Sequence, residues 1–269
     1  MPRITKLVLP VAGLGKRLLP LTNHTPKNLI KVCGKPLLEY VLGEAVGSGI
    51  KEVALIINPR HRHRFIKYLR GPGKRFPFKF HIREQKIPGG NGHAIVQAYD
   101  LLKNAPFVVR FCDDIITGHP PMTHSLIKFF ESYRAPVVLL ERVPKRLVSR
   151  FGVVEARRTR IKNKELSTAG GSLYRIRRIV EKPQPKDAPS NLTIVGGYVL
   201  TPRIIGNLKS IAETLPIIAN DALPLAVSLQ RGLIMGDEVY GWEFKGRRLD
   251  CGTFESLRKA EVMLSADYG

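Results

Sequence analysis

A glycine-rich stretch near the start of the chain, residues 7–35, contains the first side chains whose types and spacing suggest chemistry. It reads LVLPVAGLGKRLLPLTNHTPKNLIKVCGK. An apolar run leads into two glycines whose backbone N–H groups could approach a polyphosphate, and three cations would supply countercharge. These residues are Gly13, Gly15, Lys16, Arg17 and Lys27. The stretch predicts a triphosphate-binding loop, with an ordinary strand-to-helix connection as the alternative.

Two commoner phosphate loops do not fit this stretch. A Walker-type loop needs a glycine five residues before the glycine of its Gly-Lys pair, and a Ser or Thr after the Lys. Here Pro10 and Arg17 stand at those positions. A dinucleotide fingerprint would need glycine where the chain has Leu18, so neither loop type is expected.

A pair of acids forms the second candidate site. Asp113 and Asp114 directly follow the apolar run from Pro106 to Cys112, which is typical of a buried strand. Carboxylates at the carboxyl end of a parallel strand point into the crevice where open α/β sheets bind ligands. Mg²⁺ takes one or two carboxylates together with phosphate oxygens and water, so the pair could hold a metal ion. Adjacent Asp residues are also common helix caps, which is the alternative.

Two more segments contain residues suited to ligand binding. Gln85 precedes the glycine-rich turn from Pro88 to His93, and this turn opens a predicted helix from Ala94 to Leu102. Such a turn offers backbone groups to an anion or a nucleobase edge, while we interpret His93 itself as a structural residue. Glu181 and Lys182 end a predicted strand, where they could bind a ligand or form a solvated ion pair.

The elements that must position these residues follow from hydrophobic periodicity. The strand before Gly13, the helix from Pro36 to Ile50 and the strand from Glu52 to Asn58 form a βαβ unit with a parallel sheet. Further strands are predicted at 78–82, 106–112, 136–141, 150–155, 174–181 and 191–200, with an extended segment at 233–245. Further helices are predicted at 65–69, 94–102, 123–133, 222–229 with Asp221 as cap, and 253–264. No linker or repeat interrupts them, which indicates one continuous α/β domain.

Composition limits the class of protein. Of 269 residues 43% are hydrophobic, so a large core can form. No run of about 18 apolar residues occurs, so no membrane segment is expected. Cys33, Cys112 and Cys251 have no paired spacing, which argues against a disulfide framework and a zinc site and favours the cytoplasm. The net charge of +22, from 44 Lys and Arg against 22 Asp and Glu, attracts polyanions such as nucleotides or RNA.

Four separated motifs occur in an order that resembles the sugar-phosphate nucleotidyltransferases. They are Val11-Ala-Gly-Leu-Gly-Lys-Arg-Leu-Leu-Pro20 with Pro26-Lys27, Gln85 with Gly90-Asn-Gly-His-Ala94, Ile179-Val-Glu-Lys-Pro183, and Leu249-Asp-Cys-Gly-Thr253. Three further segments are most similar to the bacterial UTP–glucose-1-phosphate uridylyltransferases of that superfamily: Phe151-Gly-Val-Val154, Ala188-Pro-Ser-Asn-Leu192 and Val195-Gly-Gly-Tyr-Val-Leu200. The resemblance covers about residues 4 to 265.

The resemblance implies a fold. It is a three-layer α/β/α sandwich with a mixed, mostly parallel, Rossmann-like sheet, in a single nucleotidyltransferase domain over residues 1–269. That domain would have a nucleotide-binding half at about 1–115, a sugar-phosphate half at about 116–252 and a closing helix at about 253–265.

The resemblance also implies a reaction, the Mg²⁺-assisted transfer of the uridylyl group of UTP to glucose 1-phosphate with release of pyrophosphate. A sugar phosphate is nearly a dianion at neutral pH, because the second pKa of a phosphate monoester is about 6. It can therefore attack the α-phosphorus without a general base. The lack of a Ser-His-Asp or Cys-His arrangement in the sequence agrees with such chemistry.

On the nucleotide side, the resemblance assigns contacts with the uracil to Ala12, Gly13 and Gln85, and it places Gly90 near the base or ribose. Gly15 is expected to be a further nucleotide-binding residue. Arg17 would hold the β- and γ-phosphates, and Lys27 the α-phosphate as charge develops there. Asp113 and Asp250 would hold Mg²⁺, the one cofactor that the resemblance implies.

On the sugar side, the resemblance implies that Glu181 binds sugar hydroxyls and Lys182 the sugar phosphate. Gly197 would let the hexose lie against backbone. The expected partners are therefore a nucleoside triphosphate and a sugar 1-phosphate. A membrane partner is not expected, and a homo-oligomer is left open.

The chain departs from the family pattern at several positions. Lys16 stands where the family usually has Ser or Thr, which adds charge but removes a compact hydroxyl donor. Asn28 and Lys31 replace the usual Glu and Pro. The Gln-Leu-Thr-Asp run is missing near residues 220–227, with Leu225 roughly where the acid would fall. Because that run supports the sugar side and subunit contacts in the family, the sugar and the oligomeric state are open points.

Two alternatives remain. The first is a thymidylyltransferase or a transferase for another hexose 1-phosphate, because a few contacts discriminate the bases. The second is a weakly active family member that works as a basic regulatory or RNA-binding protein through the segment from Pro59 to Lys86. No nucleic-acid module or aromatic stacking platform is recognisable, and aromatic residues are only 7% of the chain, so nucleic acid is not the primary expectation.

Overall fold

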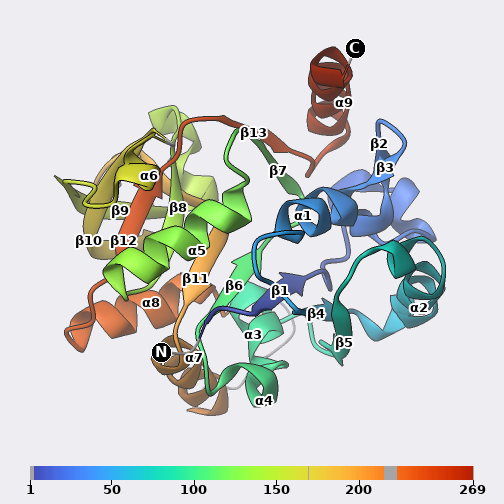
Figure 1. The fold of residues 1–269 in the computed structure, drawn as a ribbon, viewed down its shortest axis with the longest axis horizontal. Coiled ribbons are helices and arrows are strands. Elements are labelled where there is room, and N and C mark those ends of the chain that lie inside the picture. Colours follow the sequence, from blue (N-terminus) through green and yellow to red (C-terminus); the bar gives the residue numbers. More distant parts are fainter. Residues whose placement is uncertain (1–2, 169, 215–222, 269) are drawn as a thin grey trace.

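The centre of the protein is a mixed β-sheet (Figure 1). A computed structural model describes residues 3–168, 170–214 and 223–268. Within these residues nine strands pair in the order β5-β4-β1-β6-β11-β8-β12-β10-β9. Their bounds are β1 (Lys6–Pro10), β4 (Glu52–Ile57), β5 (Lys79–Glu84), β6 (Phe107–Arg110), β8 (Val137–Arg142), β9 (Gly152–Thr159), β10 (Ser172–Glu181), β11 (Leu192–Leu200) and β12 (Tyr240–Glu243). Only β10 and β11 run against the other seven, so the prediction of a mixed, mostly parallel sheet is confirmed.

Strand β1 shows why the first half of the chain forms a parallel sheet. Its residues Leu7, Val8 and Leu9 are all buried, and it pairs in parallel with β4 on one side and β6 on the other. Leu7 and Leu9 belong to one apolar layer and Val8 to the layer on the opposite face. A strand buried on both faces needs a continuous apolar run, which is the pattern that predicted this strand.

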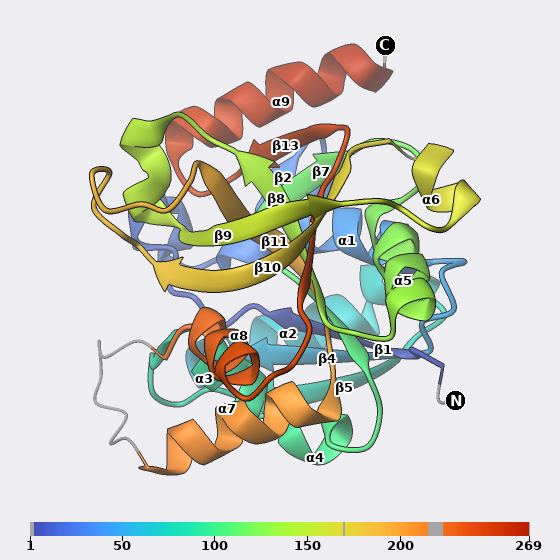
Figure 2. The ribbon, with the colours of Figure 1, turned by 90° about the vertical axis from the view of Figure 1, so that its left-hand side faces the viewer.

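Helices cover both faces of the sheet (Figure 2). One face carries α1 (Leu37–Ala45), α2 (Arg62–Arg70) and α5 (Met122–Tyr133). The other face carries α3 (Gly90–Val96), α4 (Tyr99–Leu102), α7 (Pro202–Thr214) and α8 (Leu225–Ile234). Leu38 and Phe129 belong to the first apolar layer, and Ile95 and Leu208 to the second. The predicted three-layer α/β/α sandwich is confirmed.

The sheet curls so that its edge strand β9 also pairs with β11, the central strand. Thr193 of β11 pairs with Val153 of β9, although β8, β12 and β10 lie between these strands in the sheet order. β9 also pairs with β10 in a register that places Gly152 opposite Glu181. The start of β9 and the end of β10 therefore lie beside the middle of β11.

A separate two-stranded sheet joins distant segments of the chain. β7 (Asp114–Thr117) pairs antiparallel with β13 (Arg247–Asp250), and Asp114 lies opposite Asp250. β2 (Lys31–Val32) and β3 (Lys35–Pro36) form another small pair. The helix α9 (Phe254–Tyr268) packs on β13, with Ala260 and Leu264 in the apolar contact, and lies on the outside of the molecule (Figure 1). Among the described residues, no helix has the length and apolar content needed to cross a membrane.

Several elements differ from the prediction. Among the described strands and α-helices, six have no predicted counterpart: α7, β2, β3, β7, β13 and the short helix α6 (Lys164–Thr168). The helix predicted from Pro36 to Ile50 ends at Ala45, because Gly47 and Gly49 after it adopt positive φ angles that end a helix. The helix predicted from Ala94 to Leu102 is divided into α3 and α4.

The helix predicted at residues 222–229 is displaced toward the C-terminus. α8 begins at Leu225, directly after Pro224, and continues to Ile234. The extended segment predicted from Leu233 is therefore wrong for its first two residues. The predicted cap Asp221 lies outside the described residues, as does Ala222.

Candidate active site

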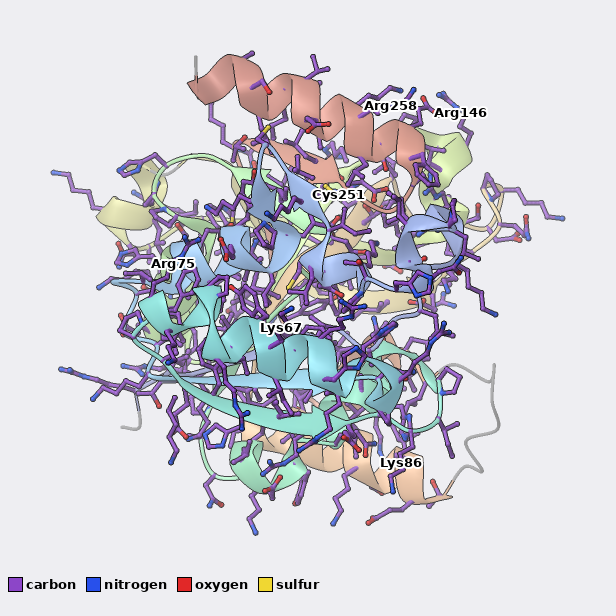
Figure 3. All side chains as sticks on the ribbon, turned by 90° about the vertical axis from the view of Figure 1, so that its right-hand side faces the viewer. Lys67, Arg75, Lys86, Arg146, Cys251 and Arg258 are labelled. Carbon is purple, nitrogen blue, oxygen red and sulfur yellow. The ribbon has the colours of Figure 1, made fainter. Side chains whose placement is uncertain are left out.

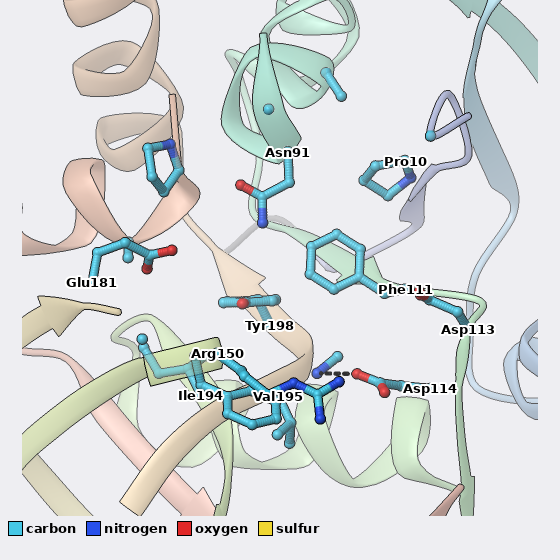
Figure 4. Close-up of a pocket in the computed structure, with 18 of the residues that line it drawn as sticks. Pro10, Asn91, Phe111, Asp113, Asp114, Arg150, Glu181, Ile194, Val195 and Tyr198 are labelled. Atoms are coloured by element: carbon cyan, nitrogen blue, oxygen red, sulfur yellow. Dashed lines mark hydrogen bonds between the residues drawn. The ribbon is translucent and has the colours of Figure 1, made fainter. Parts of the chain in front are cut away.

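Most of the predicted site residues meet in one cavity of about 600 Å³ (Figure 4). It lies beyond the ends of β1 and β6 and beside β9, β10 and β11. The predicted residues that line it are Ala12, Gly13, Arg17, Gln85, Gly90, Asp113, Glu181, Lys182 and Asp250. Figure 4 shows Asp113 and Glu181 on opposite sides of the cavity, so residues from both halves of the chain face the same space. This volume is typical of small-molecule sites.

A smaller hollow of about 230 Å³ adjoins the cavity at the glycine-rich loop. The residues that border both spaces are Pro10, Gly13, Arg17 and Asp113. Gly15, Lys16 and Lys27 border only the smaller hollow. The three cations of the loop therefore surround a space that shares a wall with the large cavity, an arrangement suited to a chain of phosphates.

The two glycines of the loop have different structural roles. Gly15 has a φ of +63°, and a Cβ at this position would collide with Thr22. The Thr22 hydroxyl donates to the carbonyl oxygen of Gly15 at 3.0 Å, which stabilises the turn before Lys16 and Arg17. Gly13 instead has open space where a side chain would be, so a ligand can approach its backbone closely.

Lys27 is held at the edge of the smaller hollow by an ion pair. Its Nζ lies 2.5 Å from Oδ2 of Asp113, and only 10% of its side chain is exposed. The partner Asp113 is 37% exposed and also borders the large cavity. A buried ammonium group beside a carboxylate keeps a fixed position, so Lys27 is pre-organised to meet an anion.

The neighbouring acid, Asp114, belongs to a separate network. Its Oδ1 accepts from Nη1 of Arg248 at 2.8 Å, and its Oδ2 accepts from the backbone N–H of Gly196 at 3.0 Å. Arg248 also donates from Nε to Oε2 of Glu141 at 2.6 Å. Burial raises the pKa of Asp114, and the guanidinium of Arg248 opposes that shift. Asp114 also lines the cavity, but both of its carboxylate oxygens are already bonded to Arg248 and β11, which leaves Asp113 as the better candidate for binding a ligand.

Asp113 and Asp250 form the candidate metal site. Oδ1 of Asp250 accepts from the backbone N–H of Gly252 at 2.7 Å, and Nη2 of Arg150 lies 3.9 Å from Oδ2 of Asp250. The described residues contain no group of three or more His, Cys, Asp or Glu that could hold a metal ion. Mg²⁺ is commonly bound by one or two carboxylates with substrate phosphates and water completing its shell. Two carboxylates that line the same cavity, one of which also borders the smaller hollow, therefore fit this ion.

Glu181 and Lys182 stand on the opposite wall, at the end of β10. Lys182 has a φ of +46°, which is rare for a residue with a side chain, and its N–H donates to the carbonyl oxygen of Phe151 at 2.9 Å. Strained backbone of this kind is concentrated at functional sites. Burial raises the pKa of Glu181, and the nearby ammonium of Lys182, 3.9 Å away, partly opposes the shift.

The variant Glu181→Gln is expected to fold at least as stably as the native protein at neutral pH. The native pKa of Glu181 is raised above its unfolded value of about 4.5, so its ionisation disfavours the folded state as pH rises through that window. The neutral amide avoids this cost. Denaturant unfolding should therefore show a higher free energy of unfolding for the variant at pH 7.5 and no gain below pH 4.

The exposed Glu155 of β9 provides the control for this measurement. Glu155→Gln should not raise the free energy of unfolding at pH 7.5. A Glu181→Gln variant that is less stable than the native protein at pH 7.5 would show that the carboxylate stabilises the fold rather than being held there for a ligand.

Gly196 and Gly197 of β11 differ from the prediction that the hexose lies against Gly197. Gly197 does not line the cavity, because the space on its side-chain position is filled by Leu139 and Leu126 of the core. Gly196 lines the cavity instead, and a Cβ there would collide with the carboxylate of Asp114. Adjacent strand residues face opposite sides of the sheet, so only one of the two glycines can face the ligand.

Tyr198 is a cavity residue that sequence reasoning missed. Its ring packs edge-to-face on Phe111, with centroids 5.8 Å apart, and both rings appear in Figure 4. Tyr198 is 6% exposed, and its hydroxyl has no hydrogen-bond partner among the described residues. Burial raises its pKa, so the hydroxyl stays protonated and can donate to a ligand. Its position two residues after Gly196, on the same face of the strand, could have predicted this.

The turn from Pro88 to His93 is held from two sides. Nε2 of Gln85 donates to the carbonyl oxygen of Gly90 at 2.9 Å and lies 3.1 Å from Nδ1 of His93. Asn91 accepts from the backbone N–H of Leu225 at 2.9 Å, which links the turn to α8. Burial lowers the pKa of His93, which agrees with a structural role. Phe151 and Asn91, which lie within the family motifs, also line the cavity, as do Arg150 and Arg248, which the sequence did not single out as site residues.

Comparisons with known proteins point in one direction. The family model described as "Nucleotidyl transferase" matches residues 6–266. A UTP–glucose-1-phosphate uridylyltransferase of Staphylococcus epidermidis is 32% identical over 273 residues, which cover 94% of this chain and 89% of that protein. UTP–glucose-1-phosphate uridylyltransferase 2 of Streptococcus pyogenes serotype M3 is also 32% identical, with coverage of 94% and 87%.

Solved structures agree with these relatives. A UDP-glucose pyrophosphorylase complexed with UDP-glucose has a TM-score of 0.83 at 29% identity, and the match covers 98% of this chain and 99% of that one. A UTP-bound UGPase from Acinetobacter baumannii has a TM-score of 0.77 at 27% identity, with coverage of 98% and 94%.

Proposed function

The chain belongs to the nucleotidyl transferase family, and we propose that it transfers the uridylyl group of UTP to glucose 1-phosphate, forming UDP-glucose and pyrophosphate. Relatives with this activity in their names match 94% of the chain, and similar solved structures contain UTP or UDP-glucose. The observation that carries the proposal is the single cavity with Arg17, Asp113 and Asp250 on one side and Glu181 and Lys182 on the other. Such a cavity can hold a triphosphate and a sugar phosphate together.

The proposed reaction needs positioning and charge neutralisation rather than a general base. The sugar phosphate is the nucleophile, and it is already almost fully ionised at neutral pH. The protein must bring two polyanions together and stabilise the charge that develops around the α-phosphorus. We assign Arg17 to the β- and γ-phosphates and Lys27 to the α-phosphate, since both border the smaller hollow.

The base and ribose are assigned to the loop and turn on the nucleotide side. Gly13 leaves its backbone open to a ligand, and Ala12 precedes it in the cavity wall. Gln85 and Gly90 line the same cavity and bind each other. We propose that these groups contact the uracil and ribose, while Gly15 shapes the loop without reaching the large cavity.

Nucleotidyltransferases of this family generally use a divalent metal ion, and we propose Mg²⁺ for this chain. Asp113 and Asp250 would hold it, because both carboxylates line the cavity. One or two carboxylates, with phosphate oxygens and water, are the usual ligands of Mg²⁺. When bound, the ion would act as a Lewis acid that neutralises phosphate charge.

On the sugar side we propose that Glu181 accepts hydrogen bonds from sugar hydroxyls and that Lys182 binds the sugar phosphate. The hexose would lie against the backbone of Gly196, in place of the Gly197 that the sequence suggested. We further propose that the chain works as a single nucleotidyltransferase domain in the cytoplasm.

We place Tyr198 on the sugar side, because it lines the cavity two residues after Gly196, against which the hexose would lie. The Tyr198→Phe variant is therefore expected to raise KM for glucose 1-phosphate by about tenfold, because one hydrogen bond to a ligand contributes roughly 1 kcal/mol or somewhat more. The melting temperature should not fall, since the hydroxyl has no partner among the described residues that could be left unpaired. Initial rates at varied glucose 1-phosphate and saturating UTP would measure the effect. An equal rise in KM for UTP would contradict the placement of Tyr198 on the sugar side.

The proposed function is tested by pyrophosphate release with every pairing of UTP, dTTP and CTP with glucose, galactose and other hexose 1-phosphates. UTP with glucose 1-phosphate should give the highest kcat/KM. A preference for dTTP or another sugar would replace the uridylyl or glucosyl assignment. No turnover with any pair would contradict an enzymatic role and favour a basic binding protein.

A further inference from the structure

A second cavity, separate from the candidate active site, lies at the outer edge of the sheet. It has a volume of about 700 Å³ and lies against β9, β10 and the C-terminal end of α8. Figure 2 shows these two strands on the side of the molecule facing the viewer. Five arginines line it, namely Arg157, Arg158, Arg160, Arg175 and Arg177, and we call it the arginine hollow.

The arginines of the hollow lie close enough to one another for their like charges to repel. Arg157 and Arg175 are directly opposite each other in the antiparallel pairing of β9 and β10, so both side chains project from the same face of the sheet. Like charges directly opposite on neighbouring strands destabilise a sheet. Arg177 lies at a register shift between Ile176 and Arg178, and bulges of this kind redirect a side chain. A bound anion would turn this repulsion into attraction.

Carboxylates neutralise only part of the hollow. Asp237 is the one acid among the described lining residues; its Oδ1 is already paired with Arg203 at 3.0 Å, and its buried Oδ2 has no hydrogen-bond partner among the described residues. Glu238 pairs with Arg175 at 2.7 Å. Within the described part of the chain, no ion pair is found for Arg157, Arg158, Arg160 or Arg177, and all four are exposed. Their guanidinium groups are therefore free to bind an anion.

We propose that the arginine hollow binds a small anion with two or more phosphate groups, such as a nucleotide or an inorganic oligophosphate. Guanidinium groups bind phosphate with two parallel N–H donors, which a lysine cluster cannot do. The volume lies in the range of small-molecule sites. The described lining contains no aromatic side chain on which successive bases could stack, so the hollow fits a compact anion better than a strand of RNA.

The hollow and the candidate active site are far enough apart to be filled together. Arg175 and Glu181 are six residues apart on β10, which corresponds to roughly 20 Å along a strand. β9 likewise runs from Gly152 at the active site to Arg157 at the hollow. Binding at the two places should therefore be two separate events.

Isothermal titration of the full chain with inorganic tripolyphosphate tests the proposal. The native protein should show two binding events, one in each cavity. Arg157→Ser/Arg177→Ser should lose one event, because each guanidinium removed should weaken binding by roughly tenfold or more. Arg17→Ala/Lys27→Ala should lose only the other event. If the proposed function is wrong and the candidate active site binds no triphosphate, the native protein should show only the binding event of the arginine hollow. Arg157→Ser/Arg177→Ser should still abolish that event.

A matched control removes two cations at the opposite edge of the sheet. Arg64 and Lys67 are exposed on α2, on the side seen in Figure 3, where Lys67 is labelled. Arg64→Ser/Lys67→Ser has the same net charge as the hollow variant and should keep both events. The unliganded hollow variant should melt no lower than the native protein, because it removes the repulsion between Arg157 and Arg175.

Two results would overturn the proposal. In the first, the hollow variant and the α2 control bind tripolyphosphate equally well. In the second, the hollow variant loses retention of an RNA oligonucleotide in a gel shift although the native protein shows no hollow-dependent binding of tripolyphosphate, which would assign the hollow to nucleic acid. Titrations with UTP and ATP then show whether a base adds to the affinity of the phosphates.

Discussion

Replacing Asp113 or Asp250 with asparagine is expected to lower kcat for pyrophosphate release by at least roughly 100-fold, the scale seen when one group that stabilises transition-state charge is removed. Both carboxylates line the cavity, and both are proposed ligands of the divalent ion. An amide is a poor ligand for Mg²⁺ because it lacks the charge. Rates measured over a range of Mg²⁺ concentrations should show that the loss is only partly recovered at high metal concentration.

Asparagine is chosen because it preserves the local hydrogen bonds. Asp250→Ala would remove the side-chain acceptor of the Gly252 backbone N–H, whereas Asp250→Asn keeps a side-chain oxygen for this bond. The same substitution at position 113 keeps an oxygen that accepts from Nζ of Lys27. The melting temperature of Asp250→Asn should therefore stay close to the native value, whereas Asp113→Asn should melt lower because it leaves the buried ammonium of Lys27 without its countercharge.

Asp100 provides a control for the loss of one negative charge. It is an acid that pairs with Arg83 and does not line the cavity. Asp100→Asn should therefore leave kcat and its dependence on Mg²⁺ close to the native values. Near-native rates in either active-site variant, or equal losses in the control, would remove the metal assignment.

Replacing Arg17 with alanine is expected to lower kcat/KM for UTP by roughly 100-fold or more, while KM for glucose 1-phosphate changes little. Arg17 borders both the large cavity and the smaller hollow, so its guanidinium stands between the two spaces. The sugar-side residues Glu181 and Lys182 lie on the opposite wall and should be unaffected. Initial rates with each substrate varied at saturating levels of the other would separate the two effects.

Lys16 provides a matched control within the same loop. It carries the same charge and is exposed, but it borders only the smaller hollow. Because Lys16 does not border the large cavity, Lys16→Ala should lower kcat/KM for UTP by less than Arg17→Ala does. Equal losses for UTP and glucose 1-phosphate in Arg17→Ala would contradict its placement. A larger loss in Lys16→Ala than in Arg17→Ala would make Lys16 the principal phosphate ligand.

Much of the fold could be predicted from local patterns. The apolar run of β1 and the helical spacing of α1 predicted the first βαβ unit. Burial of a strand on both faces requires a continuous apolar run, and burial of one helix face requires apolar residues at helical spacing. α7 was missed although its buried residues Ile204, Ile205, Leu208 and Ile211 have helical spacing. The short strands β7 and β13 were missed because four residues are too few to show a period.

The candidate site was predictable as a set of residue types but not as an arrangement. Gly13, Arg17, Asp113 and Glu181 were found because glycines, cations and acids at strand ends suit phosphate and metal chemistry. The contribution of Arg248 was not found, since its partners Asp114 and Glu141 are more than 100 residues away in the chain.

The sequence by itself determined which segments form strands and helices and which of them carry the charges and glycines, because these properties depend on neighbours a few residues apart. Only the tertiary structure decided what each member of an adjacent pair contacts. Asp113 and Asp114 both line the cavity, but Asp114 is held by Arg248 and Gly196 while Asp113 pairs with Lys27, and Gly196 rather than Gly197 lines the same space. Successive strand residues point to opposite faces, and the choice of face depends on strands that pair across distant parts of the chain.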